Sequence, residues 1–301
     1  MFETIVVGIS GHPQDAEALA LARRLADPGA EIIVASIGIL NTRRTGIGGD
    51  ALDAKALARV EDIVDAFTDG KPGLEGVVTE SDSVGAGLRD VAAGAHADLI
   101  VVSSSRRGTL GRIFAGDSVR DVLHQAPCPV AIAPVGYEPT SSRVTKIVVG
   151  HDGSPAAEAA LKRAVYLKMR EAATLEILEV VEPFSGGVAS SSLARASGVT
   201  AEYGIATHNL ERIKARYGIE GEIVAGTAAH ELARAAQDAD LLAIGLQERS
   251  LLSRMLVGST VHALLREQSA PLLIAMAATP VGDVLEPLAA EQPAEGTPDV
   301  A

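Results

Sequence analysis

The chain has 301 residues, which at roughly 150 residues per domain indicates two domains, and its 47% apolar content supplies a core for each. Its 26 basic and 39 acidic side chains give a formal net charge of −13, which repels nucleic acid and anionic membrane surfaces. Aromatic residues, at 3%, are too few for base-stacking surfaces, so we expect neither nucleic acid nor a membrane as a partner.

The first half alternates short apolar runs with segments of helical spacing. The run from Ile5 to Ile9 is typical of a strand buried on both faces, and apolar residues recur at helical intervals from Pro13 onward. The same criteria predict strands at 32–37, 76–78, 99–102 and 129–133, and helices at 52–67, 88–95 and 118–125. Five strands joined by crossover helices predict a parallel, doubly wound sheet with ligand crevices at the carboxyl ends of its strands.

The second half follows the same order. It predicts strands near 147–151, 175–181, 222–225, 241–245 and 271–275. An insert at 184–198, rich in Ser and Gly, predicts a mobile loop over the sheet edge. A Pro/Gly/Ser linker at 136–142 separates the halves, and residues 279–301 have the composition of a disordered acidic tail.

The two halves are copies of one unit. At a spacing of 142 residues, segment 5–8 recurs as 147–150, 97–100 as 239–242, and 129–133 as 271–275, while Arg112 matches Arg254 and Gly116 matches Gly258. The repeat predicts two tandem five-stranded parallel-sheet α/β domains, Rossmann-like in type, at residues 1–136 and 144–277.

A loop in the second half has the composition of a phosphate-binding site. Gly245 ends a predicted strand, and Gly258, Ser259 and Thr260 follow thirteen residues later at the start of a predicted helix. Glycine permits close backbone approach, the unpaired N–H groups of a first helical turn point outward, and the two hydroxyls add donors. A simple N-cap role for Ser259 or Thr260 is the alternative interpretation.

The chain resembles the universal stress protein family over both halves, roughly residues 2–136 and 144–277. Nucleotide-binding members carry a glycine, two residues, a second glycine, nine residues and then Gly-Ser or Gly-Thr, with an aspartate at the end of the first strand. Here Gly245, Glu248, Gly258 and Ser259 stand at the loop positions, and Asp152 stands at the strand end. The resemblance implies a stress-related regulatory protein that binds ATP or another adenine nucleotide, mainly in the second half.

The resemblance also implies a role for each of these residues. We expect Asp152 to accept a hydrogen bond from the base amine, Val180 to pack near the ring, and Gly258, Ser259 and Thr260 to donate to phosphates.

Glu248 replaces the second glycine of the family pattern. A carboxylate near phosphates is unfavourable unless a cation such as Mg²⁺ intervenes. Arg249 and Arg254 flank the loop, where they either offset this charge and contact phosphate oxygens or remain solvated surface side chains.

The first half departs further from the pattern. Its loop positions hold Ser103, Arg106 and Gly116-Asp117, and Ser10 stands at the strand end. Asp117 suits a helix N-cap but would repel a phosphate. We therefore expect the nucleotide in the second half, and a different anion site in the arginine-rich segment 106–112 stays open.

Three classes of function are compatible with the sequence. A nucleotide-responsive regulatory protein is favoured, because no nucleophile and base stand at motif spacing. A slow ATPase or nucleotidyl-transfer enzyme, with Glu248 positioning a water or Mg²⁺, and a scaffold without any ligand are the alternatives. His151 and Asp152 adjoin on a strand and point to opposite faces, so we expect no catalytic pair; His230 and His262 lack metal-ligand spacing, so we expect no resident metal site.

The number of cysteines and the lengths of the apolar stretches indicate the cellular compartment. Cys128 is the single cysteine, which excludes an internal disulfide and is typical of a reducing compartment. Residues Met1 to Ser10 carry no basic segment of a signal peptide, and the apolar stretch from Pro271 to Ala278 is far shorter than the roughly 20 residues of a membrane span. We expect a cytoplasmic protein.

The last strand of each half, 130–133 and 272–275, is apolar and lies at a sheet edge in the expected order. Such edges expose unpaired backbone groups. The family resemblance implies that the two strands pair within one chain as an intramolecular pseudo-dimer, leaving a monomer or a homodimer through another surface.

Overall fold

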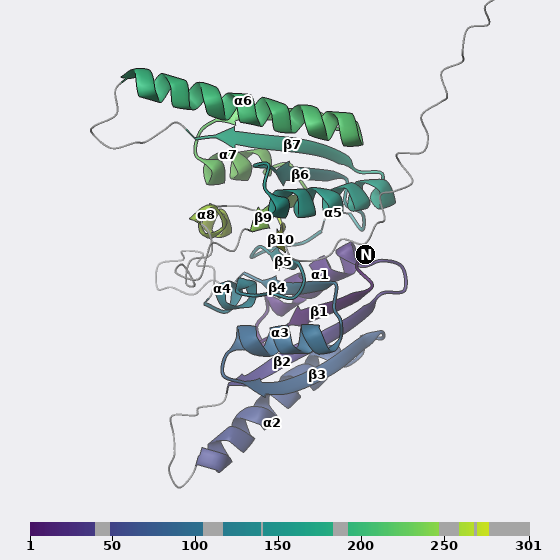
Figure 1. Cartoon of the computed structure of the whole chain (residues 1–301). Helices are drawn as coiled ribbons and strands as arrows, with labels where there is room; N and C mark the ends of the chain where they lie inside the picture. Colours follow the sequence, from purple (N-terminus) through teal and green to yellow (C-terminus); the bar gives the residue numbers. More distant parts are fainter. Residues whose placement is uncertain are drawn as a thin grey trace, which may run out of the picture.

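In the described part of the chain, ten strands form one sheet in the order β3-β2-β1-β4-β5-β10-β9-β6-β7-β8 (Figure 1). The computed structural model describes residues 1–39, 49–104, 117–139, 141–182, 192–246, 259–267 and 270–276. Within each half the strands are parallel, and β5 pairs with β10 in the one antiparallel junction between these described strands. The predicted doubly wound α/β fold is confirmed, with the two five-stranded parallel units joined in one mixed sheet.

The elements of the first half are β1 (Thr4–Gly8), α1 (Asp15–Leu25), β2 (Glu31–Ile39), α2 (Gly49–Thr68), β3 (Leu74–Ser81), α3 (Val84–Gly94), β4 (Leu99–Ser103), α4 (Asp117–Leu123) and β5 (Val130–Ala133). Those of the second half are β6 (Lys146–Gly150), α5 (Pro155–Glu171), β7 (Thr174–Val181), α6 (Ser192–Tyr217), β8 (Gly221–Ala225), α7 (Ala228–Ala235), β9 (Leu241–Leu246), α8 (Ser259–Glu267) and β10 (Leu272–Met276).

Two hydrophobic cores lie on opposite faces of the sheet. Helices α1, α2, α5 and α6 contribute to one core, and α3, α4, α7 and α8 contribute to the other. Strand residues alternate between the two, so that Val149 faces the first core and Val148 the second. Both faces are therefore covered, which is why the central strands are continuous apolar runs. Among the described residues, no helix combines the length and apolar character needed to cross a membrane.

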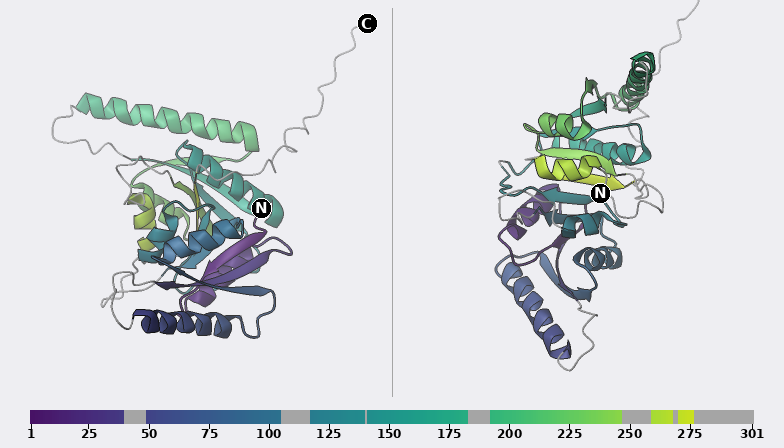
Figure 2. Two further views of the ribbon diagram at one scale, coloured as in Figure 1. Left: turned by 60° about the horizontal axis from the view of Figure 1, so that its bottom comes forward. Right: turned by 90° about the vertical axis from the view of Figure 1, so that its left-hand side faces the viewer.

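The prediction of a loop over 184–198 is wrong for its second part, because α6 begins at Ser192 and continues to Tyr217. Serine and glycine cost only roughly 0.5–1 kcal/mol each relative to alanine within a helix. That cost does not stop a helix that is already stabilised by packing further along the chain. Helices α2 and α6 lie at opposite ends of the sheet (Figures 1 and 2). The remainder of the predicted loop and the predicted acidic tail lie outside the described residues.

The halves meet where β5 pairs with β10. Ala131 lies opposite Leu273, with one further residue pair on each side, and all six side chains are at most 1% exposed. Neither strand is therefore a free edge. Side chains of the two paired strands, together with the flanking helices, belong to both hydrophobic cores, so each core continues across the junction.

A buried polar network links the halves beside this junction. The guanidinium of Arg24, on α1, donates to Tyr137 Oη, to the backbone oxygen of Arg143 and to Asp240 Oδ1. Asp240 Oδ2 in turn accepts from the backbone N–H groups of Thr145 and Lys146. Asp98, the repeat equivalent of Asp240, accepts in the same way from the backbone of the first half, but Arg24 adds a cation from the opposite half only at Asp240.

Replacing Asp240 by asparagine should destabilise the protein by about 2 to 4 kcal/mol at pH 7. Burial would raise the pKa of Asp240, but hydrogen bonds from Thr145 and Arg24 outweigh it and lower the pKa from 3.8 to about 2. This stabilisation is present above pH 3.8 and is lost as the pH falls through about 2. Urea unfolding of wild type and variant should therefore differ at pH 7 and converge in acid.

The matched control is Asp238→Asn, which removes the same charge at an exposed neighbouring position. Equal unfolding midpoints for wild type and Asp240→Asn at pH 7 would show that the network contributes nothing to stability.

Candidate functional site

A cavity of about 140 Å³ lies where the carboxyl ends of β6, β7 and β9 meet the first turns of α5 and α8. The strand order reverses here, with β9 on one side of β6 and β7 on the other, and connections leave toward opposite faces. Ligands of open α/β sheets bind at such switch points.

Four residues proposed from the sequence line this one cavity, although they come from four separate parts of the chain: Asp152, Val180, Gly245 and Thr260. Ser259 begins α8, directly before Thr260. The remaining proposed residues, Glu248, Arg249, Arg254 and Gly258, lie outside the described residues.

The loop after β6 holds Asp152 at the start of α5. Asp152 Oδ1 accepts a hydrogen bond of 3.0 Å from the backbone N–H of Ser154. Ser154 is the N-cap of α5 and accepts from Ala157 N at 3.1 Å. Asp152 Oδ2 accepts no hydrogen bond from the described residues, so one oxygen of an oriented, exposed carboxylate can receive a ligand donor.

Gly245 packs closely against the first turn of α5. A Cβ there would lie 2.2 Å from Ala157 N and 2.3 Å from Ala156 C, so the missing side chain lets β9 touch the first turn of α5. The close backbone approach at this glycine is therefore to a helix, which brings the N-termini of α5 and α8 to the same cavity. Both helix termini favour negative charge.

The equivalent loop of the first half is closed by its own side chain. Asp15 is 2% exposed, and its Oδ2 accepts from the backbone N–H groups of Ser10, Gly11 and His12 at 2.9, 2.7 and 3.0 Å. The second half has Ala157 at the position that matches Asp15. In the first half, the loop N–H groups therefore donate to a carboxylate of the chain itself. Asp117 begins α4, while Arg106 and Gly116 lie outside the described residues.

Comparison with known proteins places the chain in a family. The model of the universal stress protein family matches residues 1–134 and again residues 143–275. The chain belongs to this family. Universal stress proteins of Mycobacterium tuberculosis and Mycobacterium bovis are each 26% identical to it over 206 residues, which is 64% of this chain and 68% of each relative.

Solved universal stress proteins share the fold. One from Archaeoglobus fulgidus has a TM-score of 0.61 and 17% identity, covering 92% of this chain and 99% of its own. A putative universal stress protein from Pseudomonas aeruginosa has a TM-score of 0.63 and 19% identity, covering 91% of this chain and 93% of its own. The tandem arrangement expected from the repeat fits these matches.

Sequence reasoning missed the apolar walls of the cavity in this universal stress protein. Leu178 stands two residues before Val180, and strand alternation could have found it because both side chains share a face. Ala228 and Leu232 come from α7 and Ile244 from β9. No local pattern marks the helix residues, since only the packing of α7 against the sheet brings them to the site.

Proposed function

We propose that this protein is a cytoplasmic, stress-related regulatory protein that binds ATP or another adenine nucleotide in its second half. The observation that carries the proposal is the convergence of Asp152, Val180, Gly245 and Thr260 on one cavity at the switch point of the sheet. Family membership supports the same conclusion.

The residues present fit an adenine base. Leu178, Val180, Leu232 and Ile244 supply apolar walls, and Asp152 supplies a carboxylate oxygen that can accept from an exocyclic amine. The volume suits a base rather than a whole nucleotide. The phosphates would then lie toward the first turn of α8, where Ser259 and Thr260 stand.

Further parts of the proposal rest on the sequence. The loop pattern supports Gly258 as a phosphate donor, and Arg249 and Arg254 as phosphate contacts. It also supports a bound Mg²⁺, which would offset the charge of Glu248. In the first half the backbone N–H groups of the equivalent loop already donate to Asp15, which supports a nucleotide confined to the second half. We also propose that the two halves act as one intramolecular pseudo-dimer, which the pairing of β5 with β10 supports.

The test is to purify the full chain, denature it, and measure by mass spectrometry the small molecules that it releases. We expect an adenine nucleotide, at a molar ratio well above that released by an Asp152→Ala protein prepared in parallel. A chain that releases no nucleotide and gives no binding heat with millimolar ATP, with or without Mg²⁺, would contradict the proposal.

A further inference from the structure

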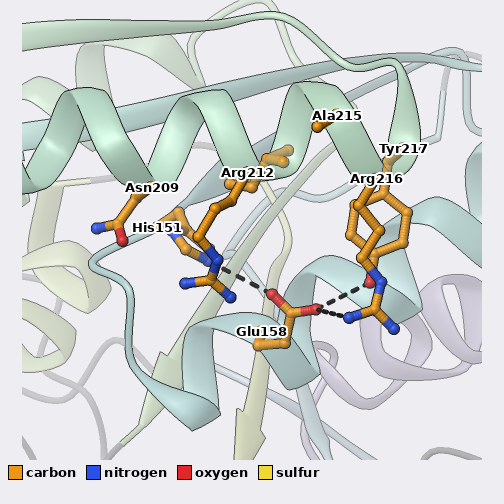
Figure 3. Close-up of a pocket in the computed structure, with 8 residues that line it drawn as sticks. His151, Glu158, Asn209, Arg212, Ala215, Arg216 and Tyr217 are labelled. Carbon is orange, nitrogen blue, oxygen red and sulfur yellow. Dashed lines mark hydrogen bonds and ion pairs between the residues drawn. The ribbon is translucent and has the colours of Figure 1, made fainter.

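A second and larger cavity, of about 330 Å³, lies between α5 and α6 (Figure 3). These two helices pack on the sheet face opposite to α7 and α8, so this cavity is distinct from the proposed nucleotide site. Its volume falls within the roughly 300–1,000 Å³ of small-molecule sites. Side chains of His151, Glu158, Asn209, Arg212, Arg216 and Tyr217 give it a polar lining.

His151 presents an unpaired donor to this cavity. Its Nδ1 accepts a hydrogen bond from Gly153 N at 3.2 Å, so the proton of the neutral imidazole resides on Nε2. The His151 side chain is only 4% exposed, and Nε2 is buried with no hydrogen-bond partner among the residues that the structure describes. A buried donor without an acceptor is costly, so an oxygen that accepted from this N–H would be favoured there.

Glu158 faces that donor across a gap. Glu158 Oε1 accepts from Tyr217 Oη at 2.8 Å, whereas Oε2 lies 3.9 Å from His151 Nε2, too far for a direct hydrogen bond. The His151 imidazole and, after it, the Tyr217 hydroxyl and Arg216 lower the pKa of Glu158 to about 2, against the effect of burial, so the carboxylate is charged at neutral pH.

An oxygen about 2.8 Å from both Nε2 and Oε2 would bridge the gap in ordinary geometry. It must accept from the imidazole and donate to the carboxylate. Among oxygen groups a hydroxyl does both, whereas an ionised carboxylate or phosphate oxygen only accepts.

Two arginines add positive charge to the same cavity. Arg212 is exposed and has no hydrogen bond or ion pair with the described residues, and its side chain is directed toward Glu158 in Figure 3. Arg216 lies 3.8 Å from Glu158 Oε1, which already accepts from Tyr217. One carboxylate against two guanidinium groups leaves a net positive lining that suits an anionic group.

We propose that the cavity between α5 and α6 binds a small phosphorylated polyol or sugar phosphate. One ligand hydroxyl bridges His151 Nε2 and Glu158 Oε2, and the phosphate lies against Arg212 and Arg216. The site is separate from the nucleotide proposal, although His151 directly precedes Asp152 and contributes to both cavities.

The test uses glycerol 3-phosphate as the smallest probe of this class, with inorganic phosphate and glycerol as its two separate parts. Isothermal titration calorimetry of the full chain should show glycerol 3-phosphate binding at least about tenfold more tightly than either part, because only the whole molecule engages both the bridge and the arginines. NMR spectra of histidine-labelled protein, recorded during titration with glycerol 3-phosphate, should show the His151 resonances shifting with the affinity that calorimetry gives.

Arg212→Gln should weaken glycerol 3-phosphate binding about tenfold. Lys214→Gln is the matched control, because Lys214 is exposed on the same helix, carries the same charge and does not line the cavity. ATP binding should be unchanged in both variants, which separates this site from the nucleotide site.

Three results would overturn the proposal. The first is binding of inorganic phosphate as tight as that of glycerol 3-phosphate, which removes the hydroxyl from the argument. The second is an equal loss of affinity in the Arg212 and Lys214 variants. The third is the absence of both binding heat and His151 shifts at millimolar glycerol 3-phosphate, which would mean that water alone fills the gap between His151 and Glu158.

Discussion

Replacing Asp152 by alanine together with Ser259 by aspartate should abolish ATP binding by this protein. The first change removes the carboxylate proposed to accept from the base amine, and loss of a hydrogen bond to a charged group costs roughly 1.5–3 kcal/mol, or about 10- to 100-fold in affinity. The second puts a negative charge beside the proposed phosphate position at the start of α8. Calorimetry with ATP and Mg²⁺ measures the loss.

The double variant should still fold. Asp152 is exposed, and aspartate at the first turn of a helix is favourable for the helix itself. Asp117→Ala, at the start of α4 in the first half, is the control and should leave ATP affinity unchanged. If Asp117→Ala abolishes binding and the double variant retains it, the nucleotide has been assigned to the wrong half.

Residues 1–138 and 143–301, expressed separately, should each form self-dimers or aggregates, and co-expression should restore a one-to-one complex. Separation exposes the apolar edges of β5 and β10, whose backbone groups pair with each other in the intact chain. It also leaves the buried Arg24 without two of its three acceptors, Asp240 and the Arg143 backbone. Size-exclusion chromatography with light scattering distinguishes these states.

A control for this experiment is the intact chain cleaved in the linker between the halves after it has folded. It should remain one complex, since the β5–β10 pairing and the Arg24 network do not depend on chain continuity. Two monomeric halves that fail to associate would instead show that the junction does not hold the halves together.

The sequence predicted the fold class because this fold has a strong local signature. Parallel strands covered on both faces must be apolar along their whole length, and three such runs of the first half recur in the second half at a spacing of 142 residues. Edge strands are less marked: β3 extends over Leu74–Ser81, whereas only 76–78 was predicted, because its exposed positions carry Glu75 and Glu80. Helix α6 was missed at its start because serine and glycine composition is a weak guide to helix ends.

The candidate site could be predicted only in part. Asp152, Val180 and Gly245 follow or end parallel strands, and carboxyl ends of parallel strands gather at one edge, so their convergence follows from topology. Leu232 on α7 carries no such mark. Asp15 likewise carries no local mark, because only the folded loop brings three backbone N–H groups to its carboxylate.

By itself, the sequence determined the α/β class, the duplication and the strand ends that we propose as a binding site, because periodicity and chain order are local properties. The tertiary structure alone decided how helices sit against the sheet and against each other. The gap between His151 and Glu158, the register of β5 against β10 and the contact of Arg24 with Asp240 all depend on it. The β5–β10 pairing and the Arg24–Asp240 contact join residues far apart in the chain. All of these distances are set by the packing of whole elements, which no local pattern encodes.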